Sequence, residues 1–235
     1  MRRPAPTLAT ACALAALLVA AACASAAPVG PLGPARASLA KPKTDWDPIP
    51  YGKGRKRQMA NYSRRHYGKR TWRLTDPRVI VLHYTATSTY GPAFATFASN
   101  APSLGEKPGV CAQFVVAKDG TIHQLTRLGV RCRHAVGLNH RAIGVEVVQQ
   151  ARSSKHGADR AILARRRQVG PLARLVAWLK QRYGIRMKDV IGHSMANDSP
   201  YFKDLEGWRN DHVDWLRGDV RKLRELVAKV ARKHR

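Results

Sequence analysis

Three histidines and a carboxylate occupy positions in the sequence from which folding could bring them into one cavity. His83 lies at the end of the apolar run VIVLHY, and His193 ends the short run DVIGH. Side chains at the tips of buried strands are aimed by a rigid element. The segment NDHVDW then supplies His212 and Asp214, two residues apart. Two histidines and a carboxylate are a common ligand set for a catalytic zinc ion, which leaves a fourth position for water.

A second carboxylate, Glu146, lies inside the apolar run AIGVEVV. A buried carboxylate is costly unless it is paired or functional, and a general base beside a zinc-bound water would explain it. Alternate residues of an extended segment point to opposite sides. If Asp214 binds a metal, His212 therefore needs a local bend to face the same cavity.

The elements that must position these residues alternate between strands and helices. Residues 79–84 and 142–148 are continuous apolar runs, typical of strands buried on both faces. Two β-rich runs flank Asp119-Gly120, which predicts a hairpin. Helical patterns cover three segments, with Gly184 ending the second: 91–99, 171–183 and 219–233. The alternation predicts an α/β domain with a central, mostly mixed β-sheet flanked by helices.

Charge and length limit the classes of function. The 235 residues suffice for one domain plus a tail, and 44% hydrophobic residues can bury a core. Lysine and arginine number 42 against 15 acidic residues, for a formal charge of +27. Such a charge implies an anionic partner, whether nucleic acid, a cell-surface polymer or a membrane surface.

The N-terminal region predicts export. Residues 1–26 combine Arg2 and Arg3 with a short apolar run and small residues, the pattern of a signal peptide. Cleavage after Ala26 and lipoprotein processing at Cys23 both fit this pattern. The expected location is the periplasm, the cell envelope or the medium. In an exported protein, Cys111 and Cys132 can form a disulfide, the alternative being two buried thiols.

Residues 27–70 are rich in proline, glycine and basic residues and show no sustained periodicity. They are interpreted as a linker or solvated arm that could hold anionic envelope polymers. Stacking on nucleic-acid bases would also be possible through Tyr51, Tyr62 and Tyr67. The sequence contains no motif for base recognition, so no specific nucleic acid is expected. The folded domain is predicted to begin near residue 71 and to extend to residue 235.

Four blocks of the chain resemble consecutive blocks of a known enzyme family. They read VIVLHYTAT, CAQFVVAKDGTIHQL, RHAVGLNHRAIGVEVV, and VIGHSMAND followed by NDHVDW. In this order, over residues 71–217, they are similar to the zinc-dependent N-acetylmuramoyl-L-alanine amidases, which share a fold with the peptidoglycan recognition proteins. The resemblance implies a single catalytic domain of that fold with Zn²⁺ as its cofactor.

The resemblance also implies roles for particular residues. His83 and His193 match the first and second zinc ligands of the family, and Asp214 matches the third. Glu146 matches the family's glutamate, which implies a general base. His212 stands where the family places a group that stabilises the developing oxyanion.

Other positions match the family less completely. His134, in the block HAVG, is expected beside the substrate groove rather than on the metal, and Tyr84 is expected on the same side. Gln113 replaces the histidine or tyrosine that the family usually carries there, and is also assigned to substrate binding. The stretch between the second and third ligands is longer than in compact members, so Asp204 and Asp211 are rival third ligands.

The function implied is hydrolysis of the amide bond between N-acetylmuramic acid and the L-alanine of the stem peptide. The expected partners are peptidoglycan or muropeptides, and the expected state is a monomer. The alternative is a non-catalytic module of the same fold that binds muropeptides without cleaving them. The complete candidate ligand set argues against that alternative.

Overall fold

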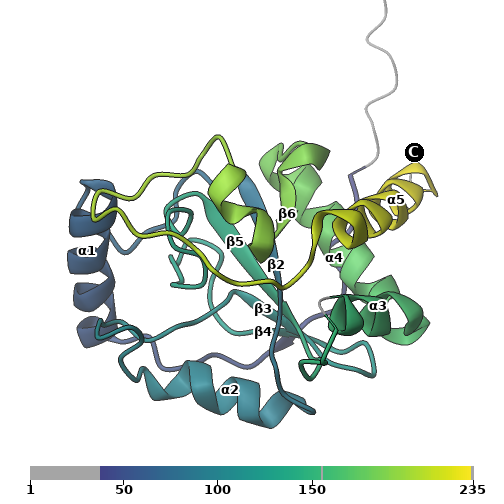
Figure 1. Ribbon diagram of the computed structural model, residues 1–235, viewed down its shortest axis with the longest axis horizontal. Helices are drawn as coiled ribbons and strands as arrows, with labels where there is room; N and C mark the ends of the chain where they lie inside the picture. The colour runs from purple at the N-terminus through teal and green to yellow at the C-terminus, as the bar shows by residue number, and fades with distance from the viewer. Residues whose placement is uncertain (1–37, 155, 234–235) are drawn as a thin grey trace, which may run out of the picture. The chain divides into compact units, whose positions relative to one another are not determined.

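A computed structural model describes residues 38–154 and 156–233 of the chain (Figure 1). The predicted signal peptide, its Cys23 and residues 27–37 lie outside the described residues. The described residues belong to one compact unit. No helix in the described ranges is long and apolar enough to cross a membrane.

One mixed sheet carries the functional residues. Its described strands are β1 (Asp45–Trp46), β2 (Val79–Tyr84), β3 (Phe114–Val116), β4 (Ile122–Gln124), β5 (Ala142–Val147) and β6 (Val190–Gly192). They lie in the order β1-β4-β3-β5-β2-β6. The β3–β4 pair is antiparallel and the other pairs are parallel. The predicted α/β fold with a mixed central sheet is therefore confirmed.

Helices cover both faces of this sheet (Figure 1). They are α1 (Lys53–Tyr67), α2 (Tyr90–Ser99), α3 (Gly157–Ala164), α4 (Arg166–Tyr183) and α5 (Arg217–Lys233), with 3₁₀ turns η1 (Met187–Asp189) and η2 (His193–Asp198). Because side chains alternate along a strand, Phe114 and Val116 join the core under α4 and α5, whereas Val115 joins Phe97 of α2. The sheet is thus buried on both sides, as its apolar strands predict.

The local signals in the sequence are confirmed at several points. Asp119 and Gly120 form the turn between β3 and β4, with Gly120 at φ +98° and the Asp119 carboxylate accepting from the Thr121 N–H. Helix α4 ends at Gly184, whose φ of +63° lies in the left-handed region that favours glycine. Cys111 and Cys132 are joined by a disulfide.

The expectation of a solvated arm over residues 27–70 is wrong for its described C-terminal part. Residues 45–46 form β1, which pairs with β4. Helix α1 packs into the domain with a buried face that includes Met59, Tyr62 and Tyr67. The buried Arg55 guanidinium of the same helix donates to main-chain carbonyls of α2 and of the following loop. The folded unit therefore begins well before residue 71.

Candidate active site

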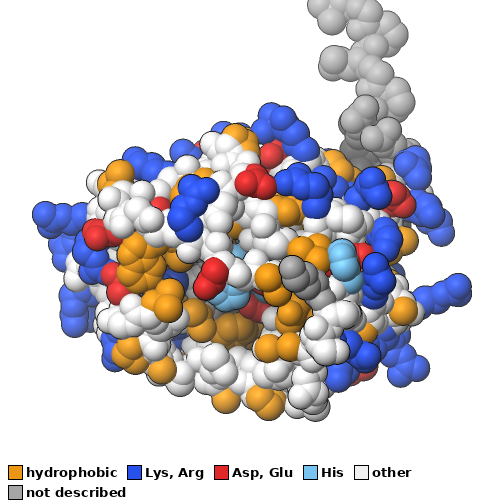
Figure 2. All heavy atoms as spheres, in the orientation of Figure 1, with side chains coloured by type: hydrophobic (Ala, Val, Ile, Leu, Met, Phe, Trp, Pro, Cys, Tyr) orange, Lys and Arg blue, Asp and Glu red, His pale blue; other side chains and the backbone are white. Residues whose placement is uncertain are grey.

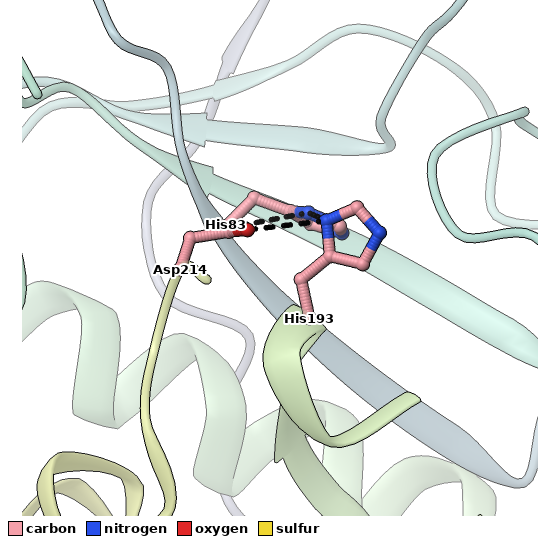
Figure 3. Close-up of side chains that lie close together, drawn as sticks. All are labelled: His83, His193 and Asp214. Atoms are coloured by element: carbon pink, nitrogen blue, oxygen red, sulfur yellow. Dashed lines mark hydrogen bonds and ion pairs between the residues drawn. The ribbon is translucent and has the colours of Figure 1, made fainter. Parts of the chain in front are cut away.

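His83, His193 and Asp214 converge on one point from three separate elements (Figure 3). His83 is the fifth residue of β2, His193 directly follows β6, and Asp214 lies in the loop before α5. The Nδ1 atoms of the two histidines are 3.0 Å apart. Each Nδ1 lies 3.3 Å from an oxygen of Asp214. All three residues are buried.

These separations fit a tetrahedral metal ion. Zinc binds histidine nitrogen and carboxylate oxygen at about 2.0–2.2 Å, so neighbouring ligand atoms of a tetrahedral site lie about 3.3 Å apart. Burial alone would raise the pKa of Asp214, but the adjacent His193 and His83 side chains hold it well below its ordinary value. Burial, aided by His193, lowers the pKa of His83 to about 4. Asp214 is therefore ionised and the His83 imidazole is neutral. In these protonation states both groups can bind a metal.

Hydrogen bonds of the Nε2 atoms determine which ring nitrogen of each histidine faces this point. His193 Nε2 lies 2.9 Å from the Oδ1 of Asn210. The Asn210 amide is oriented by donating through Nδ2 to the Val136 carbonyl, so its oxygen must accept from His193. His83 Nε2 lies 3.0 Å from His134 Nδ1. A histidine that donates through Nε2 presents the lone pair of Nδ1, which is how metal-binding histidines are commonly oriented.

Asp214 is held in place by its neighbours. The Asp159 carboxylate of α3 accepts hydrogen bonds from the backbone N–H groups of Trp215 and Leu216. The buried Trp215 indole donates to the main-chain carbonyl of His83. Trp215 has φ +57°, which produces a sharp bend directly after Asp214. The loop is therefore attached both to α3 and to the strand that carries the first histidine.

Glu146 lies beside this centre on the adjacent strand. It is the direct register partner of His83 in the parallel β2–β5 pair, and its side chain is buried. Its Oε2 has no hydrogen-bond partner among the described residues. Burial, followed by the charge of Asp214, raises the pKa of Glu146 to about 8. A buried carboxyl group with an unused oxygen can take up and release a proton near neutral pH.

His212 shares the cavity with Asp214, as the bend predicted for this segment requires. Its ring stacks on that of His193 at a centroid distance of 4.1 Å. Its side chain is 60% exposed and lies 3.2 Å from a carboxylate oxygen of Asp211. Burial and the nearby His193 lower the pKa of His212. His212 therefore presents an uncharged imidazole ring at the solvent side of the centre.

The centre opens into a cavity of about 490 Å³. Apart from the groups described above, its lining is mainly apolar and includes Tyr84, Phe97, Val110 and Val213. Figure 2 shows histidine in a hollow bordered by hydrophobic and uncharged surface and by an acidic side chain, with many lysine and arginine side chains toward the edges of this face. His134 and Tyr84, both expected on the substrate side, line this cavity.

Two other expected positions lie elsewhere. Gln113 is fully buried in the sheet, where its amide donates to the Val130 carbonyl and accepts from the Gly144 N–H. The assignment of Gln113 to substrate binding is therefore corrected to a structural role. Of the rival third ligands, Asp204 pairs with His66 of α1, and Asp211 has a 96% exposed side chain. Neither belongs to the group that converges with the two histidines.

Sequence reasoning missed two residues that orient this centre, Asn210 and Asp159. Asn210 holds His193, and Asp159 holds the loop of Asp214. Asp159 falls in a helical segment where a carboxylate is ordinary, and Asn210 precedes Asp211 in a polar loop. Only the burial of Asp159 distinguishes it, and burial is not visible in the sequence.

Several solved structures are similar to this chain. The endolysin amidase LysCS from Clostridium intestinale URNW has 20% identity and a TM-score of 0.44, covering 69% of this chain and 88% of its own. A selenomethionine derivative of AmpD has 18% identity and a TM-score of 0.47, covering 77% and 93%. AmiD from E. coli, in complex with a substrate that contains anhydro-N-acetylmuramic acid, has 23% identity and a TM-score of 0.40, covering 51% and 50%. A comparison with curated proteins gives no match.

The comparison with protein families identifies the chain more directly. A family model described as N-acetylmuramoyl-L-alanine amidase matches residues 73–214. The matched range is more than half of the chain. It begins just before β2 and ends on Asp214, so it contains His83, Glu146 and His193 as well. The chain belongs to the N-acetylmuramoyl-L-alanine amidase family.

Proposed function

We propose that this chain is an exported, zinc-dependent hydrolase of the amide bond between N-acetylmuramic acid and L-alanine in peptidoglycan. The observation that carries the proposal is the set of three ligating side chains whose facing atoms lie 3.0–3.3 Å apart. On the neighbouring strand, Oε2 of Glu146 has no hydrogen-bond partner in the described part of the chain. The family supplies the bond that is cleaved. The geometry supports hydrolysis over simple binding, because a binding module needs neither a metal centre nor a buried acid.

His83, His193 and Asp214 would hold the zinc ion. When bound there, zinc would act as a Lewis acid that makes water more acidic and polarises a carbonyl oxygen. Glu146 takes the proton of the attacking water at Oε2 and passes it to the leaving amine of L-alanine. Its raised pKa, about 8, suits both steps, because the group can gain and lose a proton near neutral pH.

The other residues around the centre bind and orient. The His212 ring N–H is placed to donate to the oxygen on which negative charge develops. His134 holds the ring of His83 through the Nε2–Nδ1 contact, while Tyr84 lies at the mouth of the cavity and contacts the substrate. The apolar walls exclude water and so strengthen these polar interactions.

Export is part of the proposal. The pattern of residues 1–26 supports a signal peptide, with lipid attachment at Cys23 as the variant form. Peptidoglycan lies outside the cytoplasmic membrane, so export brings enzyme and substrate together. The disulfide between Cys111 and Cys132 is consistent with an oxidising compartment. The formal charge of +27 supports attraction to anionic polymers of the envelope.

The test is digestion of purified peptidoglycan by the mature protein, with and without a chelator. Mass spectrometry should find new L-alanine amino termini that require the metal, and elemental analysis should find about one zinc per chain. Glu146→Gln should keep the zinc and lose about 10²–10⁴-fold in rate. Glu225→Gln, an exposed carboxylate on α5, is the matched control. Intact peptidoglycan that still binds the protein would favour the non-catalytic module instead.

A further inference from the structure

A second cavity lies on the β1 side of the sheet, and the amidase chemistry does not use it. Its volume is about 450 Å³. We define the Trp72 groove by six of its lining residues: Trp46, Lys56, Trp72, Arg73, Thr126 and Arg127. They come from β1, from α1, from the segment before β2 and from the loop after β4. The groove shares no lining residue with the cavity of the metal centre.

Backbone pairing holds the basic side of the groove in shape. The main-chain carbonyl of Trp72 accepts from the Arg131 N–H, and the Leu74 N–H donates to the Gly129 carbonyl. An antiparallel bridge pairs Arg73 with Val130 between these bonds. The segment that carries Trp72 and Arg73 is therefore fixed to the loop that carries Arg127.

The groove presents positive charge without a counter-charge. Lys56 Nζ lies 4.6 Å from the centroid of the Trp72 ring, and Arg73 Cζ lies 4.7 Å from it. Arg127 is exposed at the same groove. None of the ion pairs within the described ranges includes any of these three cations. No aspartate or glutamate lines the groove in this part of the chain. Such a site attracts an anion.

An exposed aromatic ring and a free hydroxyl add to the charge. Trp46 is 52% exposed, a high value for the largest apolar side chain, which is enriched in binding sites. Thr126 lines the same groove and is 3% exposed, and its hydroxyl oxygen has no partner among the described residues. An apolar ring face beside fixed cations suits a ligand that combines flat C–H surfaces with acidic groups.

The groove is separated from the metal centre by the width of the sheet. Trp46 lies in β1, and β4, β3 and β5 stand between β1 and the β2 strand that carries His83. At the usual strand spacing, four steps amount to about 19 Å. A polymer held in the groove would leave the entrance to the catalytic cavity free.

We propose that the Trp72 groove binds an acidic polysaccharide of the cell envelope. Sugar rings pack on the exposed face of Trp46, and their phosphate or carboxylate groups bind Lys56, Arg73 and Arg127. The choice of a polysaccharide over a nucleic acid rests on the proposed function, which places the enzyme on a wall built of glycans. The groove then concentrates the enzyme on the polymer that surrounds its substrate.

The test measures the affinity of the full chain for dextran sulfate, with neutral dextran of the same length as reference, at about 0.15 M salt. Two variants address the groove. Trp46→Ala removes the ring without changing the charge. A triple variant, Lys56→Gln with Arg73→Gln and Arg127→Gln, removes the cations. Each is expected to weaken binding to dextran sulfate by about tenfold or more.

A matched triple variant on α5 controls for the total charge. It carries Arg221→Gln, Lys229→Gln and Arg232→Gln, which are all exposed and distant in sequence from the groove. The proposal predicts a loss of no more than about threefold for this control. Equal losses in the two triple variants, or no effect of Trp46→Ala, would overturn the groove as a site. Stronger competition from a single-stranded oligonucleotide than from dextran sulfate would overturn the choice of polysaccharide.

Hydrolysis of a soluble muropeptide separates this inference from the proposed function. The groove variants should cleave a soluble muropeptide at the rate of the unmodified chain, because no groove residue lines the catalytic cavity. Unchanged polymer binding with normal hydrolysis would reject the groove alone. An unmodified chain that binds dextran sulfate but cleaves nothing would reject the amidase and leave the groove as an anion site.

Discussion

At the residue scale, the proposed metal centre depends on which ring nitrogen each histidine presents. Both histidines face the centre through Nδ1, and each engages a neighbour through Nε2. Asn210 is the neighbour of His193, and its own orientation is fixed by its bond to the Val136 carbonyl. Loss of such an outer partner frees the ring to rotate and to exchange tautomers.

Asn210→Ala is therefore expected to lower zinc affinity by about 10–100-fold, because His193 loses the acceptor that fixes its tautomer. Competition with a chromophoric chelator measures the affinity. Asn61→Ala is the matched control, since the exposed Asn61 side chain accepts a hydrogen bond from the surface residue Arg70. Equal zinc affinity in both variants would mean that the loop holds His193 without Asn210.

Glu146 makes the stability of the metal-free protein depend on pH. Burial and the charge of Asp214 raise its pKa from 4.5 to about 8. In the folded state it keeps its proton after the unfolded chain has ionised, so its contribution to stability falls as pH rises. The slope approaches about 1.4 kcal/mol per pH unit between the two pKa values. The loss is complete above the folded pKa.

Denaturant unfolding of chelated protein from about pH 6.5 to pH 8 tests this expectation. Histidines such as His83, whose folded pKa is about 4, have the opposite effect, because the unfolded chain still binds protons on them near the lower end of this range. All three chains share these histidines, so the difference between the chains reports Glu146. Relative to Glu146→Gln, the unmodified chain should lose stability as the pH rises. Glu225→Gln should follow the unmodified chain. Parallel curves for all three would mean that Glu146 is ionised in the folded protein.

The converging residues could be predicted because each carries a local signal. His83, His193 and Glu146 interrupt apolar runs, where a polar side chain has a cost that suggests a function. Asn210 and Asp159 carry no such signal, because their importance comes from partners far away in the chain. Gln113 shows the converse error. Its position in a family block suggested a role in substrate binding, but its side-chain amide forms hydrogen bonds with the backbone of Val130 and Gly144.

At the element scale, the close approach of β6 to the Asp214 loop depends on a glycine. A Cβ on Gly192 would lie 1.7 Å from the main-chain carbonyl oxygen of Trp215. Gly192→Ala must therefore displace the loop that carries Asp214. We expect loss of zinc binding in the folded protein and destabilisation by about 1–3 kcal/mol. Gly218→Ala, where nothing lies within 4 Å, is the control. Normal zinc content in Gly192→Ala would contradict this account.

The disulfide closes a loop that contains the β3–β4 hairpin. Cys111 and Cys132 are separated by 21 residues, for which loop-closure entropy predicts about 3 kcal/mol of stabilisation. The double variant Cys111→Ser with Cys132→Ser should lower the free energy of unfolding by about that amount, measured with denaturant. Chemical reduction of the disulfide should lower the free energy of unfolding by a similar amount. A reduced chain as stable as the oxidised one would mean that packing alone holds this loop.

Strands β2 to β6 and helices α2, α4 and α5 could be predicted because their buried faces are apolar. Helix α1 could not, although its buried residues recur at helical spacing: Arg55, Met59, Tyr62, Ser63, His66 and Tyr67. Half of that face is polar, so a search for apolar periodicity finds nothing. Hydrogen bonds compensate for its burial, with Arg55 donating to four main-chain carbonyls and Arg131 donating to Ser63.

At the scale of the whole molecule, α1 joins segments that lie far apart in the chain. His66 is fully buried between two carboxylates, with Nδ1 2.8 Å from Asp204 and Nε2 3.0 Å from Glu106. The backbone of Leu205 also donates to the His66 carbonyl. Asp204 lies in the long segment between His193 and Asp214, so α1 anchors the segment that leads to the third proposed metal ligand.

This arrangement predicts where the chain can be shortened. A chain of residues 38–235 keeps α1 and should fold, because it contains the core of the sheet and the buried face of α1. A chain of residues 71–235 loses the Met59, Tyr62 and Tyr67 cluster and leaves the Asp204 side chain, which has no exposed surface, without His66. Removing one partner of a buried pair costs about 3–5 kcal/mol, which is comparable to the whole stability of many domains.

Thermal unfolding followed by circular dichroism, with zinc binding as a second readout, distinguishes the two chains. The longer one should unfold cooperatively and bind zinc, and the shorter one should show neither property. His66→Ala in the longer chain isolates the contribution of the buried pair and should lower stability by about 3–5 kcal/mol. A shorter chain that melts at the same temperature as the longer one would restore the interpretation of residues up to 70 as an arm. In that case the Asp204 segment would have to hold its position without α1.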